Sequence, residues 1–210
     1  KAYYELLIET NKVMNLTAIT ELDEVITKHF LDSIALAGVF QVDRISILDL
    51  GTGAGFPGLP LKIAFPDLNI VLMDSLNKRV KFLQAVIDEL GLQSITAVHG
   101  RAEEMARQKN YREQFDICVS RAVANLSTLS EYCLPFVKVG GHFISYKAAE
   151  IEEELSDASN AINIMGGNLT AVKKLTLPGS DINRAFVIIE KEKKTPRHRY
   201  IDEVWPGLKP

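Results

Sequence analysis

The sequence predicts an α/β domain built on a mostly parallel sheet, with a helical extension before the sheet and an antiparallel hairpin at one edge. From residue 45 onward, short apolar runs alternate with helical patterns, which is typical of a parallel sheet covered on both faces. Before residue 45, apolar residues recur every three or four positions, as on one face of a helix. Only a turn region around Pro178 and Gly179 separates the last two expected strands, which favours a hairpin.

The expected elements follow in chain order. Helices occupy residues 2–40, where Thr20 is a candidate N-cap before the acidic residues Asp23 and Glu24. Strands are expected at 45–50, 69–74, 94–99, 115–120, 141–146, 169–175 and 185–191, and helices at 58–64, 77–90, 126–137 and 148–165. We therefore divide the chain into a helical extension (1–40), an α/β core (41–192) and a tail (193–210) that is first basic and then rich in proline.

Composition limits the function classes. The chain has 210 residues, enough for one sizeable core, and its net charge of −3 argues against a general nucleic-acid binder. No apolar run approaches the ~20 residues of a membrane helix, and the first residues lack the layout of a secretory signal. Cys118 and Cys133 lie in apolar segments and are expected to be buried thiols in a reducing compartment. The histidines show no metal-site spacing, so we expect no metal.

The strongest local signal is a glycine-rich loop after the first strand. Asp49 precedes three alternating glycines, Gly51, Gly53 and Gly55, and glycines let a ligand approach the backbone at the carboxyl end of a parallel sheet. Residues 53–58 also match the dinucleotide pattern G-x-G-x-x-G, which alone is weak. The carboxylate of Asp49 can accept hydrogen bonds from loop amides or contact a cationic ligand. It therefore suits S-adenosylmethionine, which carries an ammonium and a sulfonium, better than a pyrophosphate. Since no second domain is available for a dehydrogenase substrate, we favour a Rossmann-like S-adenosylmethionine-dependent methyltransferase fold.

Two further corners are candidates for the same cofactor site. Asp74 ends the second strand, where a carboxylate can accept both ribose hydroxyls of an adenosine, and Ser75 and Leu76 follow it. Ala102 and Glu103 follow the third strand, in the corner that lies against the adenine in methyltransferases of this fold.

The chain resembles the glucose-inhibited division protein B family, bacterial small-subunit ribosomal RNA guanine-N7 methyltransferases. The resemblance extends from Tyr3 to about Tyr200 and depends on several segments together. These segments are MNLTAIT (14–20), KHFLDS (28–33), LDLGTGAGFPG (48–58), DSLNKR (74–79), SRA (120–122) and KTP (194–196). After Tyr200 the family usually continues with proline and basic residues, whereas residues 201–210 are acidic and apolar.

The resemblance implies a cytoplasmic enzyme that uses S-adenosylmethionine to methylate N7 of a guanine in 16S ribosomal RNA of the small subunit. It also implies cofactor contacts at Gly51, Phe56, the Asp74 corner, Ala102–Glu103 and Arg121. Two other functions stay open: methylation of a small molecule or a protein on the same core, and a nucleotide-binding scaffold without enzymatic activity. The oligomeric state is also open, and a monomer is compatible with the sequence.

The expected chemistry needs no catalytic acid or base. Guanine N7 has an in-plane lone pair that is unprotonated at neutral pH, so we expect catalysis by positioning. Arg121 follows the fourth strand and can hold the guanine O6 edge or a phosphate, or else form an ion pair at a helix start. Phe56 either packs beside the cofactor or lies in the core. We interpret His29 and Asp32 as helix-packing residues rather than as part of the pocket rim.

Local basic residues support RNA binding despite the acidic net charge. They could track phosphates, or they could simply form a solvated charged surface. The candidates are Lys147, Arg184, Lys193, Lys194, Arg197 and Arg199.

Overall fold

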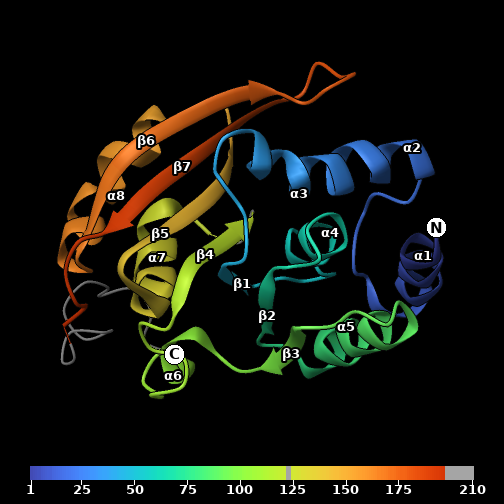
Figure 1. Ribbon diagram of the computed structural model, residues 1–210. Coiled ribbons are helices and arrows are strands. Elements are labelled where there is room, and N and C mark those ends of the chain that lie inside the picture. Colours follow the sequence, from blue (N-terminus) through green and yellow to red (C-terminus); the bar gives the residue numbers. More distant parts are fainter. Residues whose placement is uncertain (122–123, 197–210) are drawn as a thin grey trace.

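The computed structural model describes residues 1–121 and 124–196 and contains a seven-stranded sheet of order β3-β2-β1-β4-β5-β7-β6 (Figure 1). The strands are β1 (Ser46–Leu50), β2 (Asn69–Asp74), β3 (Ile95–His99), β4 (Phe115–Arg121), β5 (Val137–Ala148), β6 (Gly167–Thr176) and β7 (Asn183–Lys191). β1 to β5 pair in parallel, whereas β7 is antiparallel to both of its neighbours, β5 and β6. The predicted fold class, including the antiparallel edge hairpin, is confirmed.

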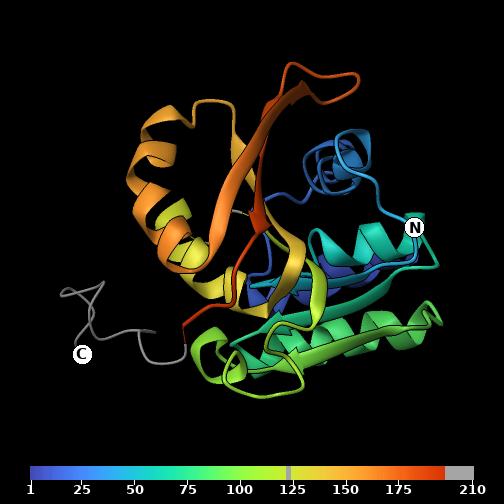
Figure 2. The same cartoon turned by 60° about the vertical axis from the view of Figure 1, so that its left-hand side comes forward.

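Helices cover both faces of the sheet and bury two separate apolar clusters. The N-terminal segments are α1 (Ala2–Met14), α2 (Leu22–Val25), a π-helical turn (Ile26–Leu31), α3 (Asp32–Ile34) and a 3-10 turn (Ala35–Gly38); those of the core are α4 (Gly58–Ala64), α5 (Asn77–Glu89), α6 (Ala102–Met105), α7 (Leu126–Cys133), a 3-10 turn (Leu134–Phe136) and α8 (Glu152–Ile164). Leu7 of α1, Leu59 of α4 and Phe82 of α5 join one cluster. Met105 of α6 and Leu129 of α7 join the other, together with α8. Figure 2 shows α7 and α8 on one side of the sheet and the N-terminal segments on the opposite side.

Some element boundaries differ from the expectations. β5 continues beyond residue 146 because Lys147 still pairs with Ala185 of β7, so α8 begins at Glu152 rather than at residue 148. The helix expected to reach residue 137 ends at Cys133 and continues as a 3-10 turn that contains Pro135. The short helix α6 was not expected.

The N-terminal helical region is less regular than its apolar spacing predicts. Thr20 is not the N-cap of α2; that position is held by Glu21, and no side chain caps it. The carbonyl of Thr20 instead accepts a hydrogen bond from the hydroxyl of Tyr4 at 2.9 Å. The backbone of Thr20 is therefore used to attach α1 to the segment that follows it.

The structure also describes the two cysteines, the length and polarity of the helices, and the spacing of side chains that could bind a metal. Cys118 and Cys133 are free and fully buried, as their apolar surroundings predict. None of the helices in this part of the chain is both long and apolar enough to cross a membrane. Residues 1–121 and 124–196 contain no group of three or more His, Cys, Asp or Glu side chains placed to hold a metal ion.

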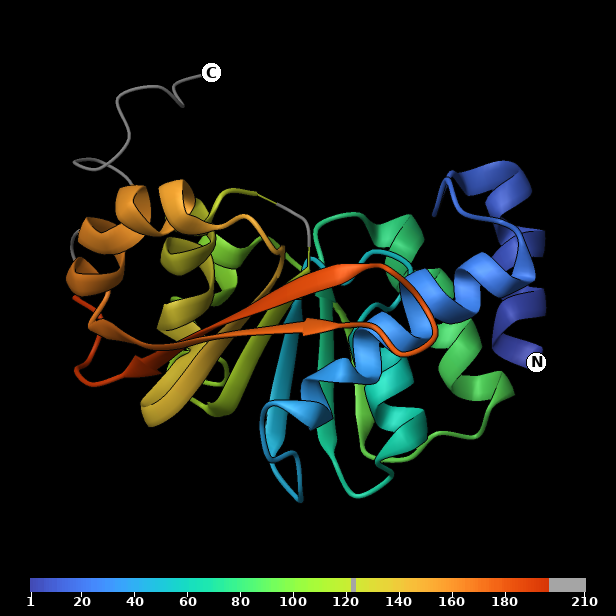
Figure 3. The same ribbon diagram turned by 90° about the horizontal axis from the view of Figure 1, so that it is seen from above.

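The β6–β7 hairpin meets the N-terminal helical segments above the carboxyl ends of the central strands. Figure 3 shows the β6–β7 hairpin crossing the N-terminal helical segments. Arg184, near the tip of this hairpin, donates a hydrogen bond from Nε to Oδ1 of Asp32 at 2.8 Å. This contact closes the region above the glycine-rich loop on one side.

Candidate active site

The glycine-rich loop after β1 adopts a backbone that side chains rarely allow. Gly51, Gly53 and Gly55 have φ angles of 70°, 60° and 101°, in the left-handed region that favours glycine. The amide of Gly51 donates to the carbonyl of Met73 in β2 at 2.9 Å, which ties the loop to the neighbouring strand. A Cβ added to Gly53 would meet no atom within 4 Å, so a ligand can approach the backbone there.

Asp74, at the end of β2, joins two loops on this side of the sheet. Its Oδ2 accepts a hydrogen bond from the amide of Gly53 at 3.0 Å, and its Oδ1 accepts one from the amide of Leu76 at 2.9 Å. Nη1 of Arg79 lies 3.5 Å from Oδ2. Oδ2 thus faces two donors, whereas Oδ1 accepts from one and keeps a second lone pair. Asp74 therefore has acceptor capacity left, on Oδ1, for a ribose hydroxyl of the kind expected there.

Asp49 lies beneath the glycine-rich loop. Its Oδ2 accepts hydrogen bonds from the hydroxyl of Thr52 at 2.6 Å and from the amide of Gly58 at 2.8 Å. Its side chain is fully buried, and this burial raises the pKa of Asp49 to about 6. Its Oδ1 has no hydrogen-bond partner among the described residues. One of the two expected roles, acceptance from a loop amide, is thus visible, and contact with a cationic cofactor stays a prediction.

Two cavities adjoin at the carboxyl ends of β1 and β2. The larger has a volume of about 710 Å³ and the smaller about 270 Å³, and both are lined by Gly51, Asp74 and Ser75. Of the other cofactor candidates, Gly53, Phe56 and Arg121 line the larger cavity, and Ala102 and Glu103 line the smaller. Asp49 and Leu76 line neither, and Leu76 is 42% exposed. The combined space suits an adenosine-containing ligand with a second molecule beside it.

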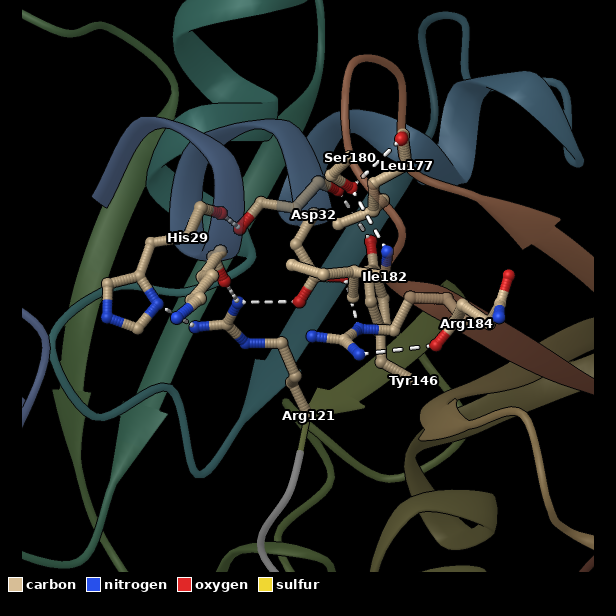
Figure 4. Close-up of polar contacts among 11 residues, drawn as sticks. His29, Asp32, Arg121, Tyr146, Leu177, Ser180, Ile182 and Arg184 are labelled. Carbon is tan, nitrogen blue, oxygen red and sulfur yellow. Dashed lines mark hydrogen bonds and ion pairs between the residues drawn. The ribbon is translucent and has the colours of Figure 1, made fainter. Parts of the chain in front are cut away.

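Three elements meet at the carboxylate of Asp32, which lines the larger cavity (Figure 4). Nη1 of Arg121, at the end of β4, donates to Oδ2 of Asp32 at 3.0 Å and to the carbonyl of Lys28 at 3.1 Å. Arg184 of β7 holds the other carboxylate oxygen. We call Asp32, Arg121, Arg184 and the adjacent His29 the Asp32 cluster. Arg121 thus forms an ion pair with the N-terminal helical segment rather than at the start of the following helix.

Phe56 and His29 complete the wall around Arg121. The guanidinium carbon of Arg121 lies 5.0 Å from the ring centroid of Phe56, within the range of a cation–π contact. The ring of His29 stacks on Phe56 at a centroid distance of 4.5 Å. Phe56 is 6% exposed and belongs to a buried apolar cluster, yet it also lines the larger cavity. Both interpretations of Phe56 therefore hold at once.

His29 is a neutral acceptor for Arg121. Nη2 of Arg121 lies 3.1 Å from Nδ1 of His29 and must donate to it, so Nδ1 carries no proton. Nε2 then donates to the hydroxyl of Thr17 at 2.8 Å. Burial first, and the Arg121 charge second, lower the pKa of His29 to about 4. The interpretation of His29 and Asp32 as packing residues was incomplete, because both also line the cavity.

Among the RNA-binding candidates, Lys147 and Arg184 line the larger cavity. Nζ of Lys147 donates to the carbonyl of Ala124 at 2.8 Å and forms an ion pair with Glu154 at 2.5 Å. These contacts attach β5 to the segment that follows β4 and to α8. Lys147 is therefore largely engaged within the protein, whereas Arg184 keeps part of its guanidinium toward the cavity.

The remaining RNA-binding candidates lie near the end of the described chain. Thr195 is almost completely buried, and its hydroxyl donates to the carbonyl of Met165 at 2.8 Å while its amide donates to Glu113 at 2.9 Å. The lysines beside it are exposed and line neither cavity: Lys193 and Lys194. The last two candidates and the divergent tail lie outside the described residues: Arg197, Arg199 and residues 201–210.

Further residues that line the larger cavity include Thr17, Lys28, Arg79 and Tyr146. The sequence offered Thr17 as a packing or pocket-rim residue and Arg79 and Tyr146 as possible RNA contacts, but it assigned none of the four to the cofactor site. Thr17 and Lys28 fall in the segments MNLTAIT and KHFLDS, on which the family resemblance depends. Tyr146 is fixed by its hydroxyl, which donates to the carbonyl of Ser33 at 2.8 Å.

The fold matches solved structures at low sequence identity. A predicted O-methyltransferase from Agrobacterium tumefaciens aligns with a TM-score of 0.60 and 14% identity, over 78% of this chain and 83% of that chain. TrmN from Thermus thermophilus aligns with a TM-score of 0.56 and 17% identity, over 77% of this chain and 48% of that one. MtNAS, crystallised in complex with MTA and tNA, aligns with a TM-score of 0.60 and 15% identity, over 91% of this chain and 69% of that one. These likenesses show the fold alone.

Sequence relatives are much closer. A protein of Lachnoclostridium phytofermentans named "Ribosomal RNA small subunit methyltransferase G" is 56% identical over 93% of this chain and 81% of its own length. Proteins of the same name from Alkaliphilus metalliredigens and Desulforamulus reducens are 52% and 53% identical over 92% of this chain, and 82% and 81% of their own lengths. The family model GidB, described as rRNA small subunit methyltransferase G, matches residues 1–187. Both findings agree with the resemblance noted from the motifs, and this chain belongs to the GidB family of rRNA small subunit methyltransferases G.

Proposed function

We propose that this chain transfers the methyl group of S-adenosylmethionine to N7 of a guanine in 16S ribosomal RNA, within the small ribosomal subunit. The observation that carries the proposal is the pair of adjoining cavities that share Gly51, Asp74 and Ser75. One cavity suits an adenosine, and the other has room for a nucleobase. The names of the relatives support small-subunit ribosomal RNA as the substrate class, and the motif resemblance supports guanine N7.

The residues at the junction of the cavities fit the cofactor. Asp74 offers the remaining lone pair of Oδ1 to a ribose hydroxyl, and Ala102 and Glu103 border the smaller cavity on the adenine side. The backbone of Gly53 adjoins open space, so it can lie against the methionine part without a side chain between them. Arg121 and the neighbouring Phe56 border the larger cavity, where the acceptor base would lie.

The transfer itself needs no proton shuttle. S-adenosylmethionine supplies an electrophilic methyl group on a positively charged sulfur. The N7 lone pair of guanine forms the new C–N bond while the C–S bond breaks, and the electron pair of the broken bond stays on sulfur. Positive charge thereby passes to the purine ring, and no proton moves. A neutral His29 with both ring nitrogens hydrogen-bonded agrees with this scheme.

Arg121 is suited to position the acceptor. Its Nη1 is used by Asp32 and by the carbonyl of Lys28, and its Nη2 is used by His29. Within the described residues its Nε donates to no acceptor, so this group can bind the guanine O6 or a phosphate. Arg121→Ala is therefore expected to lower methyl transfer strongly. Full activity in that variant would contradict an active-site role.

We further propose that the basic residues of the C-terminal region contact RNA phosphates. Such contacts are local and salt-sensitive, which agrees with a chain whose overall charge is negative. We expect the enzyme to act in the cytoplasm, and a monomer is compatible with this proposal. The residues proposed are Arg184 and Lys147 at the cavity and Lys193, Lys194, Arg197 and Arg199 beyond it.

The test uses labelled S-adenosylmethionine with small ribosomal subunits, and with naked 16S RNA, from a strain that lacks this methylation. We expect label in RNA, recovered as 7-methylguanosine after nuclease digestion and mass spectrometry. Label confined to ribosomal protein or to small molecules would overturn the substrate assignment. Calorimetry with S-adenosylhomocysteine and NAD tests the alternative of a nucleotide-binding scaffold, for which only NAD would bind.

A further inference from the structure

The charges that line the larger cavity are unevenly paired. Within the described residues, three lining cations each have an acid of their own: Lys28 with Glu24, Arg79 with Asp74, and Lys147 with Glu154. Arg121 and Arg184 instead share one carboxylate, that of Asp32, at 3.0 Å and 2.8 Å. His29 adds no charge because its nitrogens require the neutral ring. The Asp32 cluster therefore carries one net positive charge.

We propose that Asp32 is a positioning residue that holds Arg121 and Arg184 at the larger cavity and offsets one of their two positive charges. The cavity can then receive a cationic methyl donor and contain a cationic product base. Asp32 acts through the two arginines rather than through contact with a reacting atom. This inference rests on the proposed function, because both cations belong to that reaction.

The burial of Asp32 strengthens the interaction of its carboxylate with the nearby positive charges. Its side chain is 3% exposed, against 14% for Arg121 and 25% for Arg184. A carboxylate removed from water interacts more strongly with nearby charges than an exposed one does. Arg121 is also held by the carbonyl of Lys28 and by His29. Replacement of Asp32 by asparagine therefore changes the charge of the site more than it changes the placement of Arg121.

The reaction keeps one positive charge in the cavity throughout. Before transfer this charge is on the sulfur of the donor, and after transfer it is on the methylated purine. S-adenosylhomocysteine has the same groups as the donor except the methyl and the sulfonium charge. Without the Asp32 carboxylate, two uncompensated guanidinium groups should weaken the binding of the sulfonium-bearing donor. The binding of S-adenosylhomocysteine, whose sulfur is uncharged, should change little. The ratio of the two dissociation constants therefore measures the charge role of Asp32.

The experiment measures the affinities of S-adenosylmethionine and S-adenosylhomocysteine by calorimetry in wild type, Asp32→Asn and Asp67→Asn. Asp67→Asn is the matched control because it removes the same charge from an exposed side chain that lines neither of the two site cavities. In Asp32→Asn we expect the ratio of donor to product dissociation constants to rise about tenfold. We also expect kcat on small subunits to fall by at least about tenfold, since the methylated base is cationic as well. The control should change neither quantity.

Two further variants keep the inference falsifiable if Asp32→Asn folds poorly. Arg184→Gln removes one cation and should shift the ratio in the opposite direction, and Asp32→Glu should retain most of the wild-type ratio. A ratio that is unchanged in Asp32→Asn, or that moves the same way in Asp32→Asn and Arg184→Gln, would overturn the inference. These binding ratios need no RNA. Wild-type protein that binds donor and product but methylates no 16S RNA would refute the proposed function. The ratio of dissociation constants would still test the charge role of Asp32, because it is measured without RNA.

Discussion

Replacing either of two glycines near the carboxyl end of β1 by alanine is expected to destabilise the protein, but for a different physical reason at each position. At Gly58, the first residue of α4, an added Cβ would lie 2.3 Å from Cδ2 of Leu72 and 2.8 Å from Oδ2 of Asp49. Both neighbours are buried, and overpacking of this kind costs about 1–3 kcal/mol. At Gly53 an added Cβ meets nothing within 4 Å, but φ is +60°, which costs an alanine about 1–2 kcal/mol.

These magnitudes give an ordering that can be measured. For a chain of this size, each 1 kcal/mol of free energy of unfolding corresponds to roughly 2–4 °C in Tm. We expect Gly58→Ala to lower Tm by about 2–12 °C and Gly53→Ala by about 2–8 °C, measured by circular dichroism. The loss should be larger at Gly58, because its added Cβ would overlap two buried side chains. Gly53→Ala should nevertheless lose at least about tenfold in affinity for S-adenosylhomocysteine, because its methyl group occupies space needed by the ligand.

Calorimetric titration of the folded variants completes the comparison. If Gly53→Ala bound S-adenosylhomocysteine as tightly as wild type, the loop would not be the cofactor cradle. If Gly53→Ala were the less stable of the two variants, the steric assignment of Gly58 would be wrong. The outcome thus separates a glycine required for packing from a glycine required for ligand approach.

Three buried polar groups give the remaining predictions. Burial raises the pKa of Asp49 to about 6, so the folded state binds this proton more tightly than the unfolded state. The free energy of unfolding should therefore fall by up to about 3 kcal/mol as the pH rises from 4 to 6. Asp49→Asn should remove that dependence in urea titrations, and an unchanged slope would contradict it. Thr195→Val leaves the buried Lys191 ammonium and the Met165 carbonyl with one partner fewer; we expect a loss of about 1–3 kcal/mol by chemical denaturation, and an unshifted midpoint would exclude this role. The pKa of His29 is lowered to about 4, so its ring resonances should not titrate between pH 5.5 and pH 8. A midpoint near the ordinary value of about 6.5 would show that burial and Arg121 do not keep the ring neutral.

The core of the fold could be predicted because its signals are local. β2 and α4 have the expected boundaries, since an apolar run ending at Asp74 and a helix opening at Gly58 are marked in the sequence itself. The N-terminal region lacks such marks. The turn after α1 is held by Asn11, whose Oδ1 accepts from the amides of Leu16 and Thr17 at 2.6 Å and 2.9 Å. Apolar spacing cannot reveal a side chain that replaces the backbone partners of a turn.

The residues of the candidate site also fall into those that local sequence signals could place and those that they could not. Gly51, Asp74 and Ala102 could be predicted to lie together because the carboxyl ends of parallel strands share one edge. The Asp32 cluster could not, because its members are 89 and 152 positions apart along the chain and meet only after the sheet is built. For Asp49 the sequence left two roles open, and the structure shows the first of them: its carboxylate accepts hydrogen bonds from Thr52 and from the amide of Gly58 beneath the loop.

The contact between Asp32 and Arg184 has a consequence for how the protein is made. Asp32 is synthesised early, whereas Arg184 belongs to β7, which is translated after every other strand and inserts between β5 and β6. A nascent chain that stops before β7 lacks both an internal strand and one of the two cations that surround the Asp32 carboxylate. The pocket is therefore complete only when translation has passed residue 184.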